Sequence, residues 1–219
     1  MIPLRDTIPS NSFPLVTLAL IVVNTLIYFH EQSLGPAAEQ FVLHYGFVPA
    51  RYLHVSHAEP WDIAGRFGPM FSSMFLHGGL LHLLGNMWTL WIFGDNVEDR
   101  LGKGRFLFYY IICGLASVYL HYLTGRTSGV PVIGASGAIA GVMGGYFVLF
   151  PRARVLTLIP IFIFIQMMQL VSGFIASAAQ AGGGVAWWAH VGGFIAGAAV
   201  MLFLRPQHSR LSPRHSDSE

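Results

Sequence analysis

Charged residues are scarce in this chain. Asp, Glu, Lys and Arg make up 10% of its 219 residues and hydrophobic residues make up 54%, whereas a typical soluble domain is about 25% charged. The formal net charge is only +2, which excludes the strongly basic surface typical of proteins that bind nucleic acid. The composition also excludes an ordinary soluble domain, and it favours a protein that lies in a lipid bilayer.

Cysteine is almost absent as well. The one cysteine, Cys113, lies in an apolar run and cannot form an intramolecular disulfide bond, so we interpret it as a small buried apolar residue. Asp and Glu are missing from the apolar runs. His77 and His82 are five residues apart, which is a poor spacing for two metal ligands on one helix face. We therefore expect no metal ion and no cofactor.

Six apolar runs reach, or nearly reach, the length of about 20 residues that a helix needs to cross a bilayer. They cover residues 13–30, 74–94, 106–124, 135–150, 155–176 and 185–204. The first run is longer than the apolar core of a signal peptide, which has about 7–15 residues, so we interpret it as a retained helix. The predicted fold is an all-α membrane protein, a bundle of six transmembrane helices.

The remaining segments divide around this bundle. Residues 1–12 are predicted to form a short N-terminus, residues 13–204 one membrane domain, and residues 205–219 a polar tail. Residues 31–73 mix charged, aromatic and histidine side chains. They are too polar to span a bilayer and too apolar for a disordered segment, so we expect an interfacial loop with short helices. Residues 95–105 are predicted to form a charged turn.

The distribution of Lys and Arg predicts the orientation. If the N-terminus is cytoplasmic, six spans place nine of these residues inside and three outside, namely Arg51, Arg66 and Arg126. Positively charged residues favour the cytoplasmic side of a membrane. Both termini are therefore predicted to be cytoplasmic, and the 31–73 loop to lie outside.

Polar side chains inside a bilayer are costly and tend to mark function. Counting about 1.5 Å per residue from the charged cytoplasmic ends places Ser136 about 24 Å, His190 about 22 Å and His82 about 20 Å above the cytoplasmic face. The apolar core is about 30 Å thick, so all three lie in the outer leaflet. Asn86 lies on the same helix face as His82, one turn deeper. Side chains from three predicted helices therefore converge at one depth.

These side chains are suited to hydrolysis. Serine needs a neighbouring base to take its proton, and histidine can take that proton and return it to a leaving amine. We assign Ser136 as nucleophile and His190 as general base. His82 and Asn86, with the N–H groups that begin the 135–150 helix, would stabilise the oxyanion. Because no carboxylate lies in the predicted spans, the predicted centre is a Ser-His dyad.

Other functions use the same kind of helices. A serine between small residues is often a close-packing contact, and a non-catalytic relative that binds membrane helices would keep the bundle. A transporter or channel is a further alternative, but the missing carboxylates and the absence of paired repeats count against it.

Four stretches of the chain match the motifs of one known family. They are residues 134–137 (GASG), 77–86 (HGGLLHLLGN), 94–100 (GDNVEDR) and 189–197 (AHVGGFIAG). In that arrangement they resemble the GxSG, second-helix, GxxxE-x-R and AHxxGxxxG motifs of the rhomboid proteases. The resemblance covers about residues 70–205. Ala140 departs from the pattern, because some members of the family carry a tyrosine there, under the base.

The resemblance implies an intramembrane serine endopeptidase whose substrates are transmembrane proteins, cut near the outer end of their helix. Residues 13–204 would then be the catalytic domain. The fifth helix and the loop after it, with its glycines at 182–184, would act as a lateral gate and cap. We expect a multi-pass membrane protein that contacts the lipid bilayer and binds no nucleic acid. The compact core and short tails suggest a bacterial inner membrane.

Overall fold

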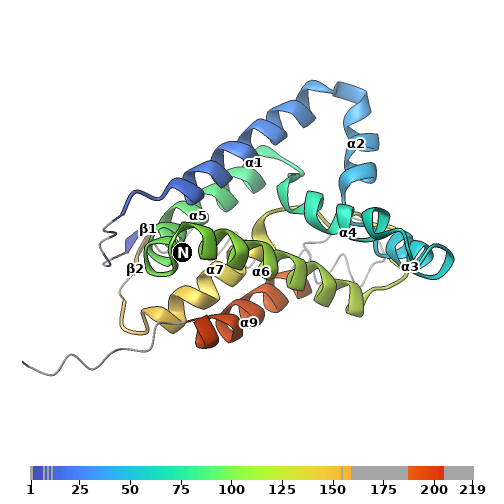
Figure 1. Ribbon diagram of the computed structural model, residues 1–219. Helices are drawn as coiled ribbons and strands as arrows, with labels where there is room; N and C mark the ends of the chain where they lie inside the picture. The colour runs from blue at the N-terminus through green and yellow to red at the C-terminus, as the bar shows by residue number, and fades with distance from the viewer. Residues whose placement is uncertain are drawn as a thin grey trace, which may run out of the picture.

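The computed structural model describes residues 2–6, 8, 10, 12–153, 155–158 and 187–204. Five long helices form the bundle in this part of the chain (Figure 1). They are α1 (Leu15–Ser33), α5 (Leu80–Leu101), α6 (Lys103–Thr124), α7 (Ser136–Leu149) and α9 (Trp187–Leu204). Each matches one predicted span, so an all-helical bundle is confirmed for these residues. Most of the fifth predicted span, residues 155–176, lies outside the described residues.

Short helices occupy the 31–73 segment, as the sequence predicts. They are η1 (Gly35–Ala37), α2 (Ala38–Tyr45), α3 (Pro49–Ala58), α4 (Ile63–Ser72) and η2 (Ser73–Phe75). Pro49 suits the first turn of α3, where its missing N–H has no helical partner. The Asp62 carboxylate begins α4 by accepting the N–H of Gly65 at 2.8 Å. In Figure 1 helices α2, α3 and α4 gather at one end of the bundle.

Two helices are longer toward their charged ends than the apolar runs predict. Helix α5 continues through the predicted charged turn to Leu101 and ends where Gly102 adopts a φ of +79°, a conformation that favours glycine. Helix α1 continues to Ser33. Glu98 and Glu31 therefore lie within these helices. The apolar runs 13–30 and 74–94 themselves contain no Asp or Glu, but the helices extend beyond these runs, because helix length is decided by hydrogen bonding and not by hydropathy alone.

A short strand replaces the start of the predicted 155–176 helix. Strand β2 (Val155–Leu158) pairs antiparallel with β1 (Ile2–Asp6), and Ile2 lies opposite Leu158. The segment VLTL alternates β-branched and leucine side chains, which suits a strand. The predicted helix is therefore wrong over these four residues. The pairing also places residues 2–6 beside the segment that follows α7.

Helices α7 and α9 run in the same direction with their backbones in contact. A Cβ atom added to Gly193 would lie 2.0 Å from the Gly137 carbonyl oxygen, and one added to Gly197 would lie 2.1 Å from that of Gly141. Contacts thus advance by four residues on both helices. Glycines at this spacing allow two helices to approach closely. Figure 1 shows α7 and α9 side by side.

Helix α6 runs antiparallel to α7. In order along α6, the side chains of Tyr109, Cys113 and Ser117 meet Gly145, Gly141 and Gly137 of α7. Helix α1 is antiparallel to α5, since Thr17 bonds Glu98 at one end and Glu31 contacts His77 at the other. These relative directions agree with the predicted order of spans.

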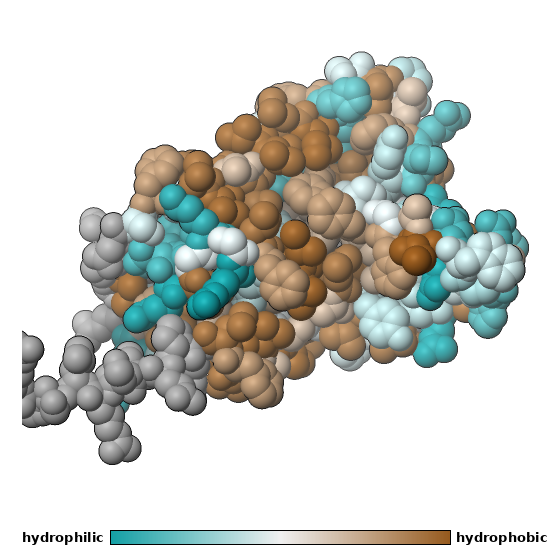
Figure 2. Space-filling model, in the orientation of Figure 1, coloured by the Kyte–Doolittle hydropathy of each residue, from teal (hydrophilic) through white to brown (hydrophobic). Residues whose placement is uncertain are grey.

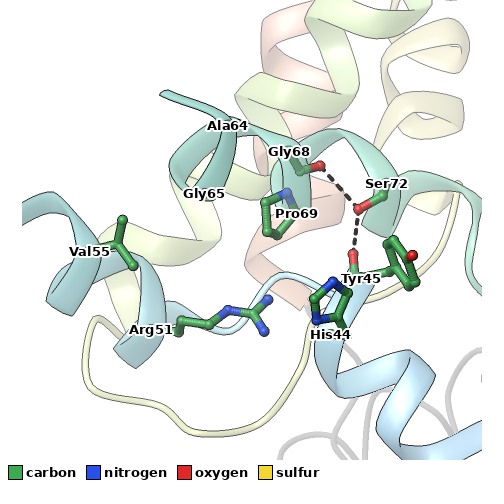
Figure 3. A pocket seen from close by; sticks show the side chains of 9 residues that line it. All are labelled: His44, Tyr45, Arg51, Val55, Ala64, Gly65, Gly68, Pro69 and Ser72. Atoms are coloured by element: carbon green, nitrogen blue, oxygen red, sulfur yellow. Dashed lines mark hydrogen bonds between the residues drawn. The ribbon is translucent and has the colours of Figure 1, made fainter. Parts of the chain in front are cut away.

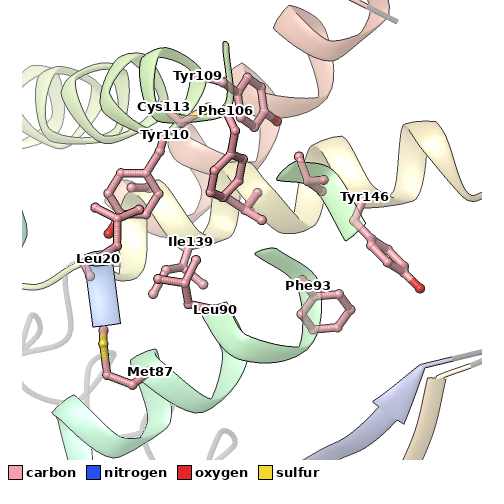
Figure 4. Close-up of a cluster of buried hydrophobic side chains, with 14 of the residues drawn as sticks. Leu20, Met87, Leu90, Phe93, Phe106, Tyr109, Tyr110, Cys113, Ile139 and Tyr146 are labelled. Atoms are coloured by element: carbon pink, nitrogen blue, oxygen red, sulfur yellow. The ribbon is translucent and has the colours of Figure 1, made fainter. Parts of the chain in front are cut away.

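The centre of the bundle is a cluster of large apolar side chains (Figure 4). Phe106, Tyr109, Tyr110 and Tyr146 are fully buried there. Cys113 is also fully buried within this cluster, which confirms its interpretation as a packed apolar residue. In Figure 2 apolar residues form a broad band across the middle of the visible face, and polar residues gather toward its two ends. By length and composition α1 and α6 could cross a membrane, and α7 and α9 are shorter apolar helices.

Candidate active site

The turn before α7 places Ser136 at the first residue of that helix. Gly134 has a φ of +124°, which residues with a Cβ atom rarely adopt. Its N–H donates to the Ser73 carbonyl at 2.8 Å, which holds the turn against η2. Ser136 is half-buried. The first N–H groups of a helix have no partner within it, so Ser136 lies beside unpaired backbone donors.

The close packing of α7 and α9 brings the predicted nucleophile and base to the same level. Gly137, which follows Ser136, contacts Gly193. His190 lies three residues, about one turn, before Gly193 on α9. His190 is half-buried. The sequence predicted that the two helices run in the same direction, and the register between Gly137 and Gly193 shows which turns meet.

A serine on α6, Ser117, contacts both α7 and α9 where these helices meet. The sequence analysis did not identify it. Ser117 is buried, and its Oγ donates to the Ala189 carbonyl at 2.6 Å. The same Oγ lies 1.9 Å from the position of a Cβ atom on Gly137. Ser117 therefore contacts the residues next to His190 and Ser136. A buried hydroxyl in an apolar run needs a hydrogen-bond partner. This requirement could have identified Ser117 from the sequence as a residue that contacts another helix.

His82 lies next to Ser136, as predicted. A Cβ atom on Gly134 would lie 2.8 Å from both Cε1 and Nε2 of His82, and 3.6 Å from the Ser136 Oγ. The imidazole and the hydroxyl are therefore neighbours of the same point, and only a glycine leaves room for both. The His82 ring also packs edge-on against His77, with centroids 5.2 Å apart.

Asn86 lies one turn further along α5, with its side chain buried. Its Nδ2 has no hydrogen-bond partner among the described residues. A buried donor without an acceptor lowers the stability of the fold by about 1–3 kcal/mol. Native structures therefore usually avoid such donors unless the group has a function. An amide donor of this kind is suited to an oxyanion that forms only during a reaction.

A buried carboxylate holds the segment that leads into α5. Glu31, near the end of α1, is 3% exposed, and its Oε2 accepts the backbone N–H of His77 at 3.4 Å. The His77 ring is fully buried, and its two nitrogens have no partner in the described part of the chain. Since His77 packs on His82, Glu31 indirectly supports the position of His82.

Glu98 ties the opposite end of α1 to α5. Its carboxylate accepts the N–H groups of Val16 and Thr17 and the Thr17 hydroxyl, at 3.0, 2.8 and 2.8 Å. Glu98 is 1% exposed. Three donors compensate the buried charge, so this residue of the predicted GxxxE-x-R stretch has a structural role.

Other predicted features lie outside the described residues, namely the lateral gate of the fifth helix and the cap around glycines 182–184. Ala140, at the position of the family's tyrosine, is half-buried on α7. Farther along these helices the rings of Phe147 and Phe194 pack together with centroids 6.0 Å apart. The described residues contain no cluster of three or more His, Cys, Asp or Glu side chains that could hold a metal ion.

Comparison with known proteins decides the family. A model described as the Rhomboid domain matches residues 64–207, well over half of the chain and all four motifs. The chain belongs to the rhomboid family. This family is membrane-embedded, so the rhomboid assignment accounts for the apolar band on the surface.

Named relatives of this rhomboid come from plants and animals. RHOMBOID-like protein 5 of Arabidopsis thaliana is 31% identical over 155 residues, which are 67% of this chain and 47% of that protein. RHOMBOID-like protein 4 of the same plant is 30% identical over 155 residues, 67% of this chain and 36% of that protein. The presenilin-associated rhomboid-like protein, mitochondrial, of Homo sapiens is 35% identical over 101 residues, 44% of this chain and 26% of that protein. The chain thus spans less than half the length of these relatives.

Proposed function

We propose that this rhomboid is an intramembrane serine endopeptidase with Ser136 as nucleophile and His190 as general base. The observation that carries the proposal is the contact between Gly137 and Gly193. It brings the first turn of α7 and the turn of α9 that bears His190 together, with the His82 ring beside the Ser136 hydroxyl. The family membership supports the same chemistry.

In the proposed reaction His190 takes the Ser136 proton while Oγ attacks the carbonyl carbon of the scissile peptide bond. The carbonyl oxygen becomes an oxyanion, which His82, the Asn86 amide and the N–H groups at the start of α7 stabilise. His190 then gives its proton to the leaving amine. Water then attacks the resulting ester while His190 takes a proton from it. As the bond to Oγ breaks, His190 gives that proton to Oγ, which releases the new carboxyl end of the substrate and restores Ser136. No cofactor or metal ion takes part.

The proposed substrates are the transmembrane segments of other membrane proteins, which reach the centre from within the bilayer. We further propose the predicted topology of six spans with both termini in the cytoplasm, residues 13–204 being the catalytic domain, 31–73 its interfacial loop and 205–219 a cytoplasmic tail. The expectation of a bacterial inner membrane gains no support from the relatives described above, which come from plants and animals. The location proposed is an integral, multi-pass position in a membrane.

Labelling with a fluorophosphonate, which reacts with activated serines, tests the proposal. The full chain in detergent should be labelled and should cleave a helical membrane substrate. Ser136→Ala should lose both labelling and substrate cleavage. His190→Ala should lose nearly all labelling and nearly all cleavage. Both variants should keep the melting temperature of the wild type. Ser10→Ala, whose exposed hydroxyl bonds the Ser12 carbonyl before α1 begins, is the matched control. Unlabelled wild-type protein would instead indicate a non-catalytic rhomboid, and cleavage by Ser136→Ala would exclude the assignment.

A further inference from the structure

A second candidate site lies between the three short helices α2, α3 and α4. It is a cavity of about 450 Å³, within the range of about 300–1,000 Å³ typical of small-molecule sites. Figure 3 shows it between the end of α2, the body of α3 and the middle of α4. Neither Ser136 nor His190 lines it.

A partly buried cation lies in this cavity. Arg51 reaches across it from α3 toward His44 on α2 (Figure 3). Its guanidinium donates to the carbonyl oxygens of Leu43 and Gly46 at the end of α2, so two of its five N–H groups are used there. These bonds hold the guanidinium in place and leave donors available for a ligand.

The charge of Arg51 is not neutralised by an acid in the cavity wall. Burial lowers the pKa of Arg51, because a cation removed from water is less stable. None of the described residues that line the cavity is Asp or Glu. Carbonyl oxygens carry only partial charges, so a bound anion would stabilise the guanidinium further. A phosphate group suits the planar fork of donors that an arginine presents.

The rest of the cavity favours a ligand that is also apolar. Val55, Ala64 and Pro69 line it, and Gly68 leaves the α4 side open, since a Cβ atom there would meet nothing within 4 Å. The Ser72 hydroxyl is already bonded to carbonyl groups. A small inorganic anion would leave most of this apolar wall without contacts.

The outer face of α4 continues this apolar wall to the surface. Ile63, Phe67 and Phe71 recur every four residues, which puts them on one helix face, and all three are exposed, Ile63 by 67%. Trp61, just before the helix, is 78% exposed. Exposed aromatic and aliphatic side chains on one face of a short helix are typical of segments that lie in a membrane interface.

We propose that this cavity binds an anionic glycerophospholipid, with the lipid phosphate held by Arg51 and His44 and the acyl chains lying along Ile63, Phe67 and Phe71. The lipid would hold α2, α3 and α4 together at the membrane interface. This site is separate from the proposed catalytic centre and does not depend on its chemistry.

Native mass spectrometry of the full chain tests the proposal. The protein is released from detergent micelles that contain increasing phosphatidylglycerol, and the occupancy of the first bound lipid is measured. The wild type should retain one lipid at saturation. Arg51→Gln should weaken its binding at least tenfold, and Gly68→Leu, which fills the cavity and leaves Arg51 in place, should do the same. Phosphatidylcholine, which has no net charge, should bind more weakly than phosphatidylglycerol.

Matched controls distinguish binding at this site from non-specific attraction of anionic lipid to the protein surface. Arg126→Gln removes another exposed arginine, and Gly104→Leu adds a side chain at an open glycine of α6; both should bind lipid as the wild type does. Equal loss in the controls, or unchanged binding in Gly68→Leu, would overturn the proposal. So would displacement of the lipid by inorganic phosphate at equimolar concentration, which would show a site for the free anion. If Arg51→Gln does not fold, Gly68→Leu decides the outcome.

Discussion

At the residue scale, two buried polar side chains differ in whether they meet the requirement for a hydrogen-bond partner. Ser117 meets its hydrogen-bonding requirement inside the bundle by donating to Ala189. Asn86 is also buried, but its Nδ2 has no partner among the described residues. We interpret the first as a positioning residue at the junction of α6, α7 and α9, and the second as a donor kept available for the reaction.

We predict that Asn86→Ala lowers kcat by about 10²-fold with little change in KM, because one oxyanion donor acts mainly in the transition state. Steady-state kinetics on a helical membrane substrate would measure both constants. Thr89→Ala, which removes a hydroxyl bonded only within α5, should leave kcat unchanged. A rise in KM with unchanged kcat for Asn86→Ala would assign this residue to substrate binding instead.

At the scale of elements, the geometry of the proposed active site depends on how closely α7 and α9 approach. The backbones touch at Gly137 and Gly193, and again at Gly141 and Gly197. Side chains at these positions would push the helices apart, because backbone atoms cannot move aside as a flexible side chain can. Since α7 bears Ser136 and α9 bears His190, the separation of the helices would set the geometry of the proposed dyad.

Gly193→Ala is therefore predicted to destabilise the fold and to abolish fluorophosphonate labelling of Ser136. Its Cβ atom would lie 2.0 Å from the Gly137 oxygen. Thermal unfolding in detergent, followed alongside labelling, would measure both effects. The control is Gly85→Ala on α5, where a Cβ atom meets nothing within 4 Å. That change should stabilise the helix by about 0.5–1 kcal/mol. Normal labelling of Gly193→Ala would contradict the proposed contact.

A second prediction at this scale concerns the junction of α1 and α5. Glu98→Gln should lower the free energy of unfolding by about 2–4 kcal/mol, because a neutral amide accepts the bonds from Val16 and Thr17 less strongly than a carboxylate does. Unfolding in detergent would measure the loss. Glu39→Gln, at an exposed position of α2, should change little. If both variants unfold alike, the buried carboxylate does not secure α1.

At the scale of the whole molecule, the relative directions of the helices divide the protein into two ends. The α2–α4 segment and the start of α7 lie at one end. The β1–β2 pair, the connection from α5 to α6 and the last residues of α7 and α9 lie at the other (Figure 1). The excess of Lys and Arg predicts that the second end faces the cytoplasm. Ser136 then lies near the outer side of the membrane.

Cysteine labelling would test this orientation. In intact cells a membrane-impermeant maleimide should label Thr127→Cys, beyond the end of α6, and should label Lys103→Cys, at its start, only after permeabilisation. Both positions are exposed, and the native Cys113 is fully buried, so the wild type should stay unlabelled. The reverse pattern would show that the second end, which carries the excess of Lys and Arg, lies outside.

Hydropathy and helix geometry are local properties, and they were sufficient for the helical bundle and for the choice of Ser136, His190, His82 and Asn86. Four predicted spans match described helices to within three residues at each end, and the 74–94 span overlaps α5 (Leu80–Leu101). Depth could be counted along each helix, because the rise per residue is constant. The sequence therefore predicts which side chains share a depth, and its motifs were sufficient to recognise the family.

Only the tertiary structure decided which residues support these side chains. Glu98 bonds residues more than 80 positions away, Ser117 bonds Ala189 across 72 positions, and Glu31 reaches His77 across 46. The cavity around Arg51 likewise forms from three separate helices. Contacts of this kind depend on helix register, which no local pattern specifies. For the same reason the room that Gly134 leaves for both His82 and Ser136 became visible only once α5 and α7 were packed together.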